Sequence, residues 1–199
     1  MPRIRVIYEK LGWIVFVNHM DLPTVFSRAA RRAELSQEFT QGFSPHPRMS
    51  LGPALSIGVE GHSEVADFWF NEWDETSMDK WNMYLPEGIK ILRTYEVDGP
   101  ALAKSINGAV YTIVSVNLDL DEETLNILEE AIKINGTLYA SKLEDGKITI
   151  KIANLEKNTP SYFVRTLVEK EKCSGWSDLR FTRDKVGFWD EIKQDIIEL

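Results

Sequence analysis

The sequence contains a single cysteine among its 199 residues. One thiol cannot form an internal disulfide, and it cannot supply the group of cysteines that binds an iron–sulfur cluster. Cys173 is therefore expected to be a partly buried side chain near a turn. The lack of cysteine excludes a disulfide-stabilised fold and any cysteine-only metal site built from this chain alone.

Long apolar runs are also missing. No stretch approaches the roughly 20 apolar residues that a membrane-spanning helix needs. The first residues, MPRIRVIYEK, alternate as a strand does and lack the charged, apolar and cleavage regions of a signal peptide. With 43% hydrophobic and 11% aromatic residues, the chain can still bury a substantial core. We therefore expect a folded cytoplasmic protein without membrane contact.

The sequence contains no Walker loop, Rossmann fingerprint, nucleophile elbow or HExxH motif. It also has fewer basic than acidic residues. The chain has 23 Lys and Arg against 31 Asp and Glu, for a net charge of -8. This balance argues against a general polyanion binder. The first 50 residues nevertheless hold seven basic and four acidic side chains, so they carry +3 and the remainder carries -11. We expect any anionic partner to bind the N-terminal part.

The first half of the chain alternates between strand-like and helix-like patterns. Leu11-Gly12, between two strand-like runs, predicts a tight turn or a kink in one long strand. A Gly-His-Ser turn at residues 61–63 is expected to join two further strands. The expected order is β-α-β-β-α-β, with strands at 3–10 and 13–18, a helix at 21–35, strands at 54–60 and 64–73, a helix at 75–86 and a strand at 89–97.

The second half repeats this order after a glycine- and proline-containing segment. We expect a strand at 110–119, a helix at 121–135, a hairpin around Asp145-Gly146, a helix at 159–171 and a strand or hairpin at 179–189. The pattern predicts an α+β fold of two tandem ferredoxin-like (βαββαβ) domains with antiparallel sheets. The predicted domains are residues 1–97 and an acidic domain at 110–199, joined by a linker at 98–109.

The segment QGFSPHPRMSLGP, residues 41–53, stands out because it combines three prolines, two glycines, a histidine and an arginine. Together with FVNHMDL and RAARRAEL upstream, it resembles an uncharacterised bacterial domain called radical SAM-associated or radical SAM-linked. That domain is found at the C-terminus of radical SAM proteins or as a separate chain. The matching positions are His19, Asp21, Arg31, Arg32, Gln41, Gly42, Phe43, Pro45, His46 and Pro47. The resemblance implies a separate radical SAM protein as partner, and it supplies no activity.

Three of these residues suggest one possible site. His19 and Asp21 lie two positions apart at the end of a strand, and His46 is held between two prolines. If the loop folds back over the helix, the three form a candidate site for a divalent metal or for acid–base catalysis. The alternative is structural, with Asp21 capping the helix and Pro-His-Pro forming a rigid corner.

The arginines of the N-terminal half suggest a second possible site. Arg28, Arg31 and Arg32 share a helix face, and Arg48 follows the loop, so together they predict an anion site at which Phe43 could stack on a base. The candidate ligand-binding or RNA-binding residues are Arg28, Arg31, Arg32, Gln41, Phe43, His46 and Arg48.

Three hypotheses follow. The leading one is an accessory protein that binds RNA, or an RNA-linked partner, through the N-terminal domain and serves a separate radical SAM enzyme. The second is a metal-binding protein or enzyme centred on His19, Asp21 and His46. The third is a protein–protein interaction module without nucleic acid. The chain has no cluster motif of its own, so on its own it is more plausibly not an enzyme.

Overall fold

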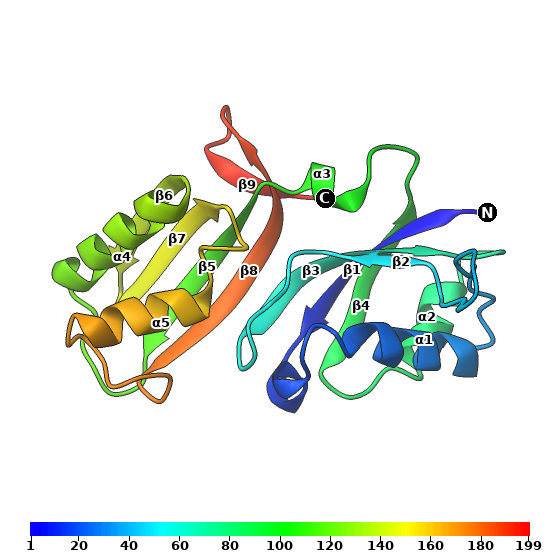
Figure 1. Ribbon diagram of the computed structural model, residues 1–199, viewed down its shortest axis with the longest axis horizontal. Coiled ribbons are helices and arrows are strands. Elements are labelled where there is room, and N and C mark those ends of the chain that lie inside the picture. The colour runs from blue at the N-terminus through cyan, green and yellow to red at the C-terminus, as the bar shows by residue number, and fades with distance from the viewer.

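The computed structural model describes residues 1–199 as a mixed α+β fold built on one nine-stranded, mostly antiparallel sheet (Figure 1). The strands are β1 (Arg3–Lys10), β2 (Met49–Leu51), β3 (Glu60–Trp69), β4 (Ile89–Glu96), β5 (Gly108–Ser115), β6 (Leu138–Glu144), β7 (Lys147–Ala153), β8 (Leu179–Asp190) and β9 (Asp195–Glu198). The helices are α1 (Leu22–Arg32), α2 (Ser77–Asn82), α3 (Leu102–Ser105), α4 (Glu122–Asn135) and α5 (Pro160–Glu169), with a short 3-10 helix η1 (Gly12–Phe16).

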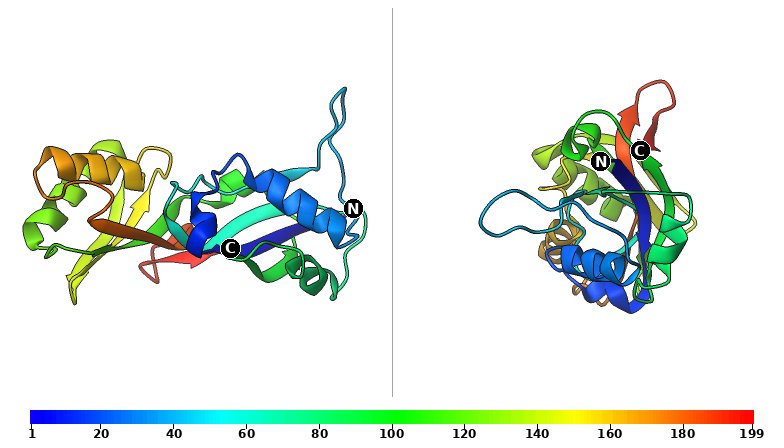
Figure 2. Two further views of the ribbon diagram at one scale, coloured as in Figure 1. Left: turned by 90° about the horizontal axis from the view of Figure 1, so that it is seen from below. Right: turned by 90° about the vertical axis from the view of Figure 1, so that its right-hand side faces the viewer.

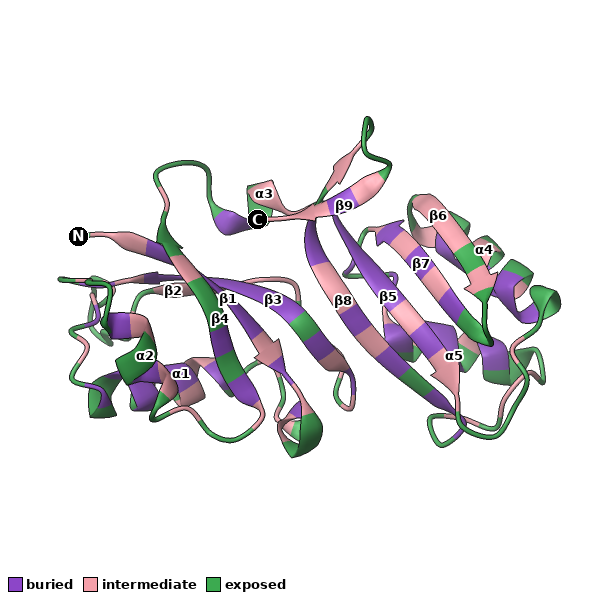
Figure 3. Ribbon diagram, turned by 180° about the vertical axis from the view of Figure 1, so that it is seen from behind, coloured by how far each residue is buried: buried purple, intermediate pink, exposed green.

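The sheet runs in the order β4-β1-β3-β8-β5-β7-β6, while β2 pairs with β3 and β9 pairs with β8. All of these pairings are antiparallel except β3 with β8. Helices α1 and α2 pack on the N-terminal lobe, and α4 and α5 pack on the C-terminal lobe (Figure 1). Figure 3, seen from behind, shows the other face of the sheet in front of these four helices. None of the helices is both long and apolar enough to cross a membrane.

The structure has two hydrophobic cores, one within the N-terminal lobe and one in the C-terminal lobe that also includes four residues of the N-terminal lobe, Ile7, Leu55, Val59 and Val65. In the N-terminal lobe Phe26, Phe68 and Trp81 are fully buried, and the Trp81 Nε1–H donates to the Phe26 carbonyl at 3.1 Å. In the C-terminal lobe Leu128 and Phe163 pack from the helices against the inner faces of β5, β7 and β8. The two cores explain why the sequence shows the same helix and strand periods twice.

Much of the predicted element order is confirmed. The helices fall where their periodicity placed them. Asp121 and Thr159 cap α4 and α5, since each side chain accepts a hydrogen bond from the backbone N–H three residues on. The hairpin turn at Asp145-Gly146 has positive φ at both residues, 52° and 69°, as a type I′ turn requires. The predicted linker includes the one-turn helix α3.

Two strand predictions were wrong. Residues 13–18 do not continue β1, because Gly12 enters the left-handed region at φ 64° and the chain coils into η1. Residues 54–59 form no strand and include a turn with Gly58 at φ 82°, and residues 61–63 lie inside β3 instead of joining two strands. The partner strand is β2, which the proline-rich segment itself supplies.

The two lobes meet where β3 and β8 pair over only two positions, Glu60 with Thr182 and Gly61 with Arg183. Arg183 is fully buried there. Its guanidinium holds the Glu64 carboxylate with two nitrogens, one of them at 2.8 Å. It also donates to the carbonyl oxygens of Pro53 at 2.8 Å and Ala54 at 3.2 Å. One side chain of the C-terminal lobe therefore satisfies three acceptors of the N-terminal lobe.

Gly61 makes room for this contact. It lies between Lys10 on β1 and Arg183 on β8, directly opposite both. A Cβ at Gly61 would lie 2.6 Å from Cγ of Glu64, so the Glu64 side chain occupies the space that a larger residue would fill. Lys10 is buried and donates to the carbonyl of Val17 at 2.6 Å. Burial lowers its pKa, an effect that the nearby Arg183 increases and Glu64 opposes.

Replacing Arg183 by methionine is expected to destabilise the protein by about 3–5 kcal/mol, because Glu64 is left buried without its partner. Arg183→Met combined with Glu64→Leu is expected to cost less than Arg183→Met alone. The matched control is Arg165→Met, which breaks an exposed ion pair with Glu169 and is expected to cost less than about 1 kcal/mol. Urea unfolding of the four proteins measures these differences. A loss for Arg183→Met no larger than for the control would contradict this view of the lobe junction.

Candidate functional site

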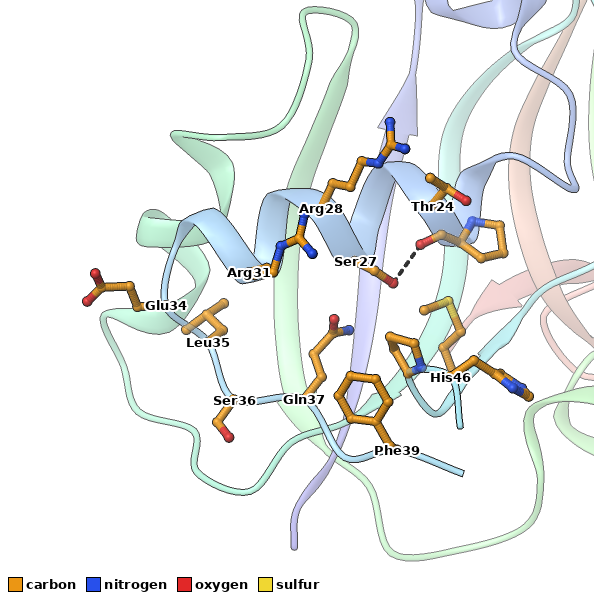
Figure 4. Close-up of a pocket in the computed structure, with 13 residues that line it drawn as sticks. Thr24, Ser27, Arg28, Arg31, Glu34, Leu35, Ser36, Gln37, Phe39 and His46 are labelled. Carbon is orange, nitrogen blue, oxygen red and sulfur yellow. Dashed lines mark hydrogen bonds between the residues drawn. The ribbon is translucent and has the colours of Figure 1, made fainter. Parts of the chain in front are cut away.

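A groove of about 820 Å³ lies between α1 and the segment that follows it, residues 34–49 (Figure 4). We call it the α1 groove. One wall is formed by the exposed side of α1, including Thr24, Ser27 and Arg28. The other wall is formed by side chains of the returning chain, including Gln37 and Phe39. The groove thus lies within the most basic part of the sequence.

The end of α1 sets the direction of the returning chain. Glu34 adopts the left-handed conformation with φ 58°, and the Leu35 N–H donates back to the Ala30 carbonyl at 2.9 Å. The chain therefore reverses immediately after the helix and runs beside it. This reversal creates the two walls of the α1 groove.

The returning chain is held by backbone pairing with the end of β3. Gln37 forms a bridge with Phe70, and the Glu38 N–H donates to the Trp69 carbonyl at 2.8 Å. Farther out, Phe39 bridges to Pro47, and the Arg48 N–H donates to the Glu38 carbonyl at 2.7 Å. The proline-rich segment is therefore a narrow antiparallel loop on a fixed base, and Figure 2 shows it projecting from the body of the protein.

Gln37 is the most unusual residue of the groove. Its side chain is only 9% exposed, yet Nε2 has no hydrogen-bond partner. Figure 4 shows its amide extending from the returning chain toward α1. Buried amides are normally paired, because an unsatisfied donor costs about 1–3 kcal/mol. The α1 groove therefore contains a polar group that nothing in the folded chain satisfies.

Arg28 and Arg31 also line the groove, and both are exposed. No ion pair in the structure includes either of them. Glu34 lies at one end of the groove, with its carboxylate directed outward in Figure 4. The helix wall therefore carries two cations that are free to bind an anion.

The other predicted anion-binding residues lie elsewhere. Arg32 is exposed on α1 but does not line the groove. Arg48 forms an ion pair with Glu38 at 3.0 Å and lies over the ring of Trp69, 4.4 Å from its centroid. Gln41 and Phe43 are at the exposed tip of the loop, outside the groove. Of the predicted set, the structure brings Arg28, Arg31 and His46 together.

His46 lies at the edge of the groove, where Nδ1 is 3.2 Å from the Thr40 hydroxyl oxygen. His19 is half-buried, does not line the groove, and lies within electrostatic range of Arg183, Glu64 and Lys10. Asp21 occupies the N-cap position of α1, but its carboxylate accepts from the Asn18 amide and not from the helix backbone. No group of three or more His, Cys, Asp or Glu side chains is arranged to hold a metal ion. The predicted set of His19, Asp21 and His46 is therefore not assembled.

Sequence reasoning missed Gln37 and Phe39. They belong to the run SQEFT, residues 36–40, between the helix and the proline-rich segment. The available signal was their spacing, because side chains two residues apart on an extended chain point to the same side. The reversal at Glu34, which turns that side toward α1, has no comparable signal in the sequence.

Comparison with known proteins identifies the family. Residues 3–173 match the model of a family described as uncharacterized proteins conserved in bacteria, DUF2344. The chain belongs to this family. The match covers both walls of the α1 groove and the N-terminal side of the lobe junction, and it ends before Arg183. No curated protein matches the sequence of this DUF2344 member.

A solved structure similar to this DUF2344 chain is the crystal structure of the acetolactate synthase small subunit from Thermotoga maritima. The two are 12% identical, with 96% of this chain and 99% of that chain covered and a TM-score of 0.28. A likeness of this degree carries no argument about the site.

The surroundings of His19 lead to a pH-dependent prediction. Burial lowers its pKa below the ordinary 6.5, and the nearby cations Arg183 and Lys10 lower it further, against an opposing effect of Glu64. Below about pH 6.5 the unfolded chain therefore binds a proton at His19 that the folded chain resists. Stability that is present at pH 7.5 is lost as the pH falls below 6.5 toward the folded pKa.

The free energy of unfolding is expected to fall less between pH 7.5 and pH 5.5 for His19→Gln than for the wild type, measured by urea unfolding. His46→Gln, at an exposed loop position, is the control and is expected to keep the wild-type dependence. Equal pH dependence for His19→Gln and the wild type would show that His19 is not held in its neutral form.

Proposed function

We propose that the protein binds single-stranded RNA through the α1 groove. The observation that carries this proposal is the unpaired cationic wall formed by Arg28 and Arg31, facing a wall that holds Gln37 and Phe39. Cations that contact phosphates, next to an aromatic ring and a hydrogen-bonding side chain, are the combination used for single-stranded nucleic acid. The positive balance of the first 50 residues supports this assignment.

The acidic C-terminal lobe is consistent with a confined binding site. The chain as a whole carries -8, so a long nucleic acid lying across both lobes would meet repulsion. A strand bound along α1 and the returning chain avoids the second lobe. We therefore expect short single strands to bind as well as long ones.

We further propose that the RNA-bound protein serves a separate radical SAM enzyme, on the strength of the resemblance of QGFSPHP, residues 41–47, to the radical SAM-associated domain. The loop tip is the surface available for this partner, since Phe43 is fully exposed there and lies outside the α1 groove. A photoreactive residue in place of Phe43 is expected to capture a radical SAM enzyme in bacterial cells. Capture of other proteins only would contradict this assignment.

We also propose that residues 1–97 and 110–199 are tandem ferredoxin-like units joined by residues 98–109. Two observations support this. Each half has the order β-α-β-β-α-β, and the strands lie in the equivalent spatial orders β4-β1-β3-β2 and β8-β5-β7-β6.

Replacing both Arg28 and Arg31 by alanine is expected to weaken binding of single-stranded RNA by about tenfold or more and to reduce the slope of log K against log salt by about 1.4. Fluorescence anisotropy with labelled oligonucleotides across a salt series measures both quantities. The matched comparison is between two single variants, Arg31→Ala and Arg32→Ala. Each of them removes one positive charge from the same helix.

Arg32→Ala is expected to retain most of the affinity, since Arg32 does not line the groove. Equal losses for Arg31→Ala and Arg32→Ala would mean that binding depends on charge alone and not on the groove. No binding at low salt by the wild type would contradict RNA binding altogether and would favour a module that contacts protein only.

A further inference from the structure

The unpaired amide of Gln37 indicates which part of a ligand the α1 groove binds. The Gln37 backbone is paired with Phe70 in an antiparallel bridge, which fixes the position from which its side chain projects. Its Nε2 is buried and has no partner. A group that costs stability in the free protein is explained most simply by a ligand that pairs with it.

Phe39 lies beside this amide. Gln37 and Phe39 are two residues apart on an extended segment, so both side chains project to the same side, toward α1. Figure 4 shows the Phe39 ring next to the Gln37 side chain. Although it lines the groove, Phe39 is 52% exposed. The wall therefore combines a free aromatic face with a free amide.

These two features match one chemical group. A nucleobase offers a flat face for stacking, and its edge offers hydrogen-bond donors and acceptors of the kind that pair with a glutamine amide. Unstacked bases of single-stranded RNA are recognised in this way, on an aromatic face and through their edge. A phosphate alone would use neither the ring of Phe39 nor the depth at which Gln37 lies.

We propose that the α1 groove holds one unstacked nucleobase of the RNA, with its face on Phe39 and its edge hydrogen-bonded to the Gln37 amide. This proposal rests on the proposed function, and it makes Gln37 the residue that determines base preference. Arg28 and Arg31 contact the phosphates on either side and contribute affinity that does not depend on the base.

The test compares labelled adenine, cytosine and uracil homo-oligonucleotides of about ten nucleotides with an abasic strand of the same length. The wild type is expected to bind its preferred base about tenfold more tightly than the abasic strand, as stacking of one base on an aromatic ring predicts. Gln37→Leu is expected to flatten the differences between the bases and to keep the abasic affinity. Arg28→Ala with Arg31→Ala is expected to weaken all four strands alike.

Stability gives a second measurement. Gln37→Leu removes a buried amide without a partner, so its urea midpoint is expected not to fall below that of the wild type. A clear drop would mean that Gln37 supports the fold, and this would overturn its assignment as the base-reading residue.

The possible failures are distinguishable. Equal binding of abasic and base-containing strands by the wild type would overturn the base pocket and leave the proposed RNA binding intact. Base differences that persist in Gln37→Leu would overturn the role of Gln37. Absence of binding to every strand would overturn both proposals together.

Discussion

The buried contact between Arg183 and Glu64 is the interaction on which the arrangement of the two lobes depends. The pairing of β3 with β8, which joins the two halves of the single sheet, spans only two positions. Arg183 adds hydrogen bonds to three residues of the N-terminal lobe, Glu64, Pro53 and Ala54, and Gly61 provides the space for the carboxylate. The cost of burying these charges makes the contact all-or-none, because either partner alone would be left unpaired. The lobes are therefore expected to keep one relative orientation.

The same strand that carries Glu64 also supports the candidate site at its other end. Directly after the end of β3 at Trp69, Phe70 forms an isolated bridge with Gln37 and holds the chain that returns along α1. The α1 groove is therefore formed on a rigid base, although the loop beyond it projects into solvent. Rigidity explains how Gln37 can remain buried without a partner: the surrounding backbone hydrogen bonds determine its position and outweigh the cost of one unsatisfied amide. The molecule thus separates a fixed groove from an exposed loop tip that carries Phe43.

Periodicity in the sequence predicted the helices and the hairpin at Asp145-Gly146, because a buried stripe or a glycine turn leaves a local pattern. It did not predict that the two halves share one sheet, since the Arg183–Glu64 contact joins residues 119 positions apart and leaves no such pattern. The site was predicted in part. Arg28, Arg31 and His46 do line one groove, whereas Arg48 pairs with Glu38 and His19 lies by the lobe junction. Whether an arginine is available to a ligand depends on whether the fold places an acidic side chain beside it, as it places Glu38 beside Arg48.

We propose that RNA lies in the α1 groove, between α1 and residues 34–49. Ultraviolet cross-linking of the protein to a short single-stranded RNA, followed by peptide mass spectrometry, tests it most directly. RNA in the α1 groove is expected to cross-link to the peptide that carries Gln37 and Phe39, and not to the acidic lobe from residue 110 onward. Cross-links concentrated on the sheet face opposite the helices, or in the C-terminal lobe, would contradict it.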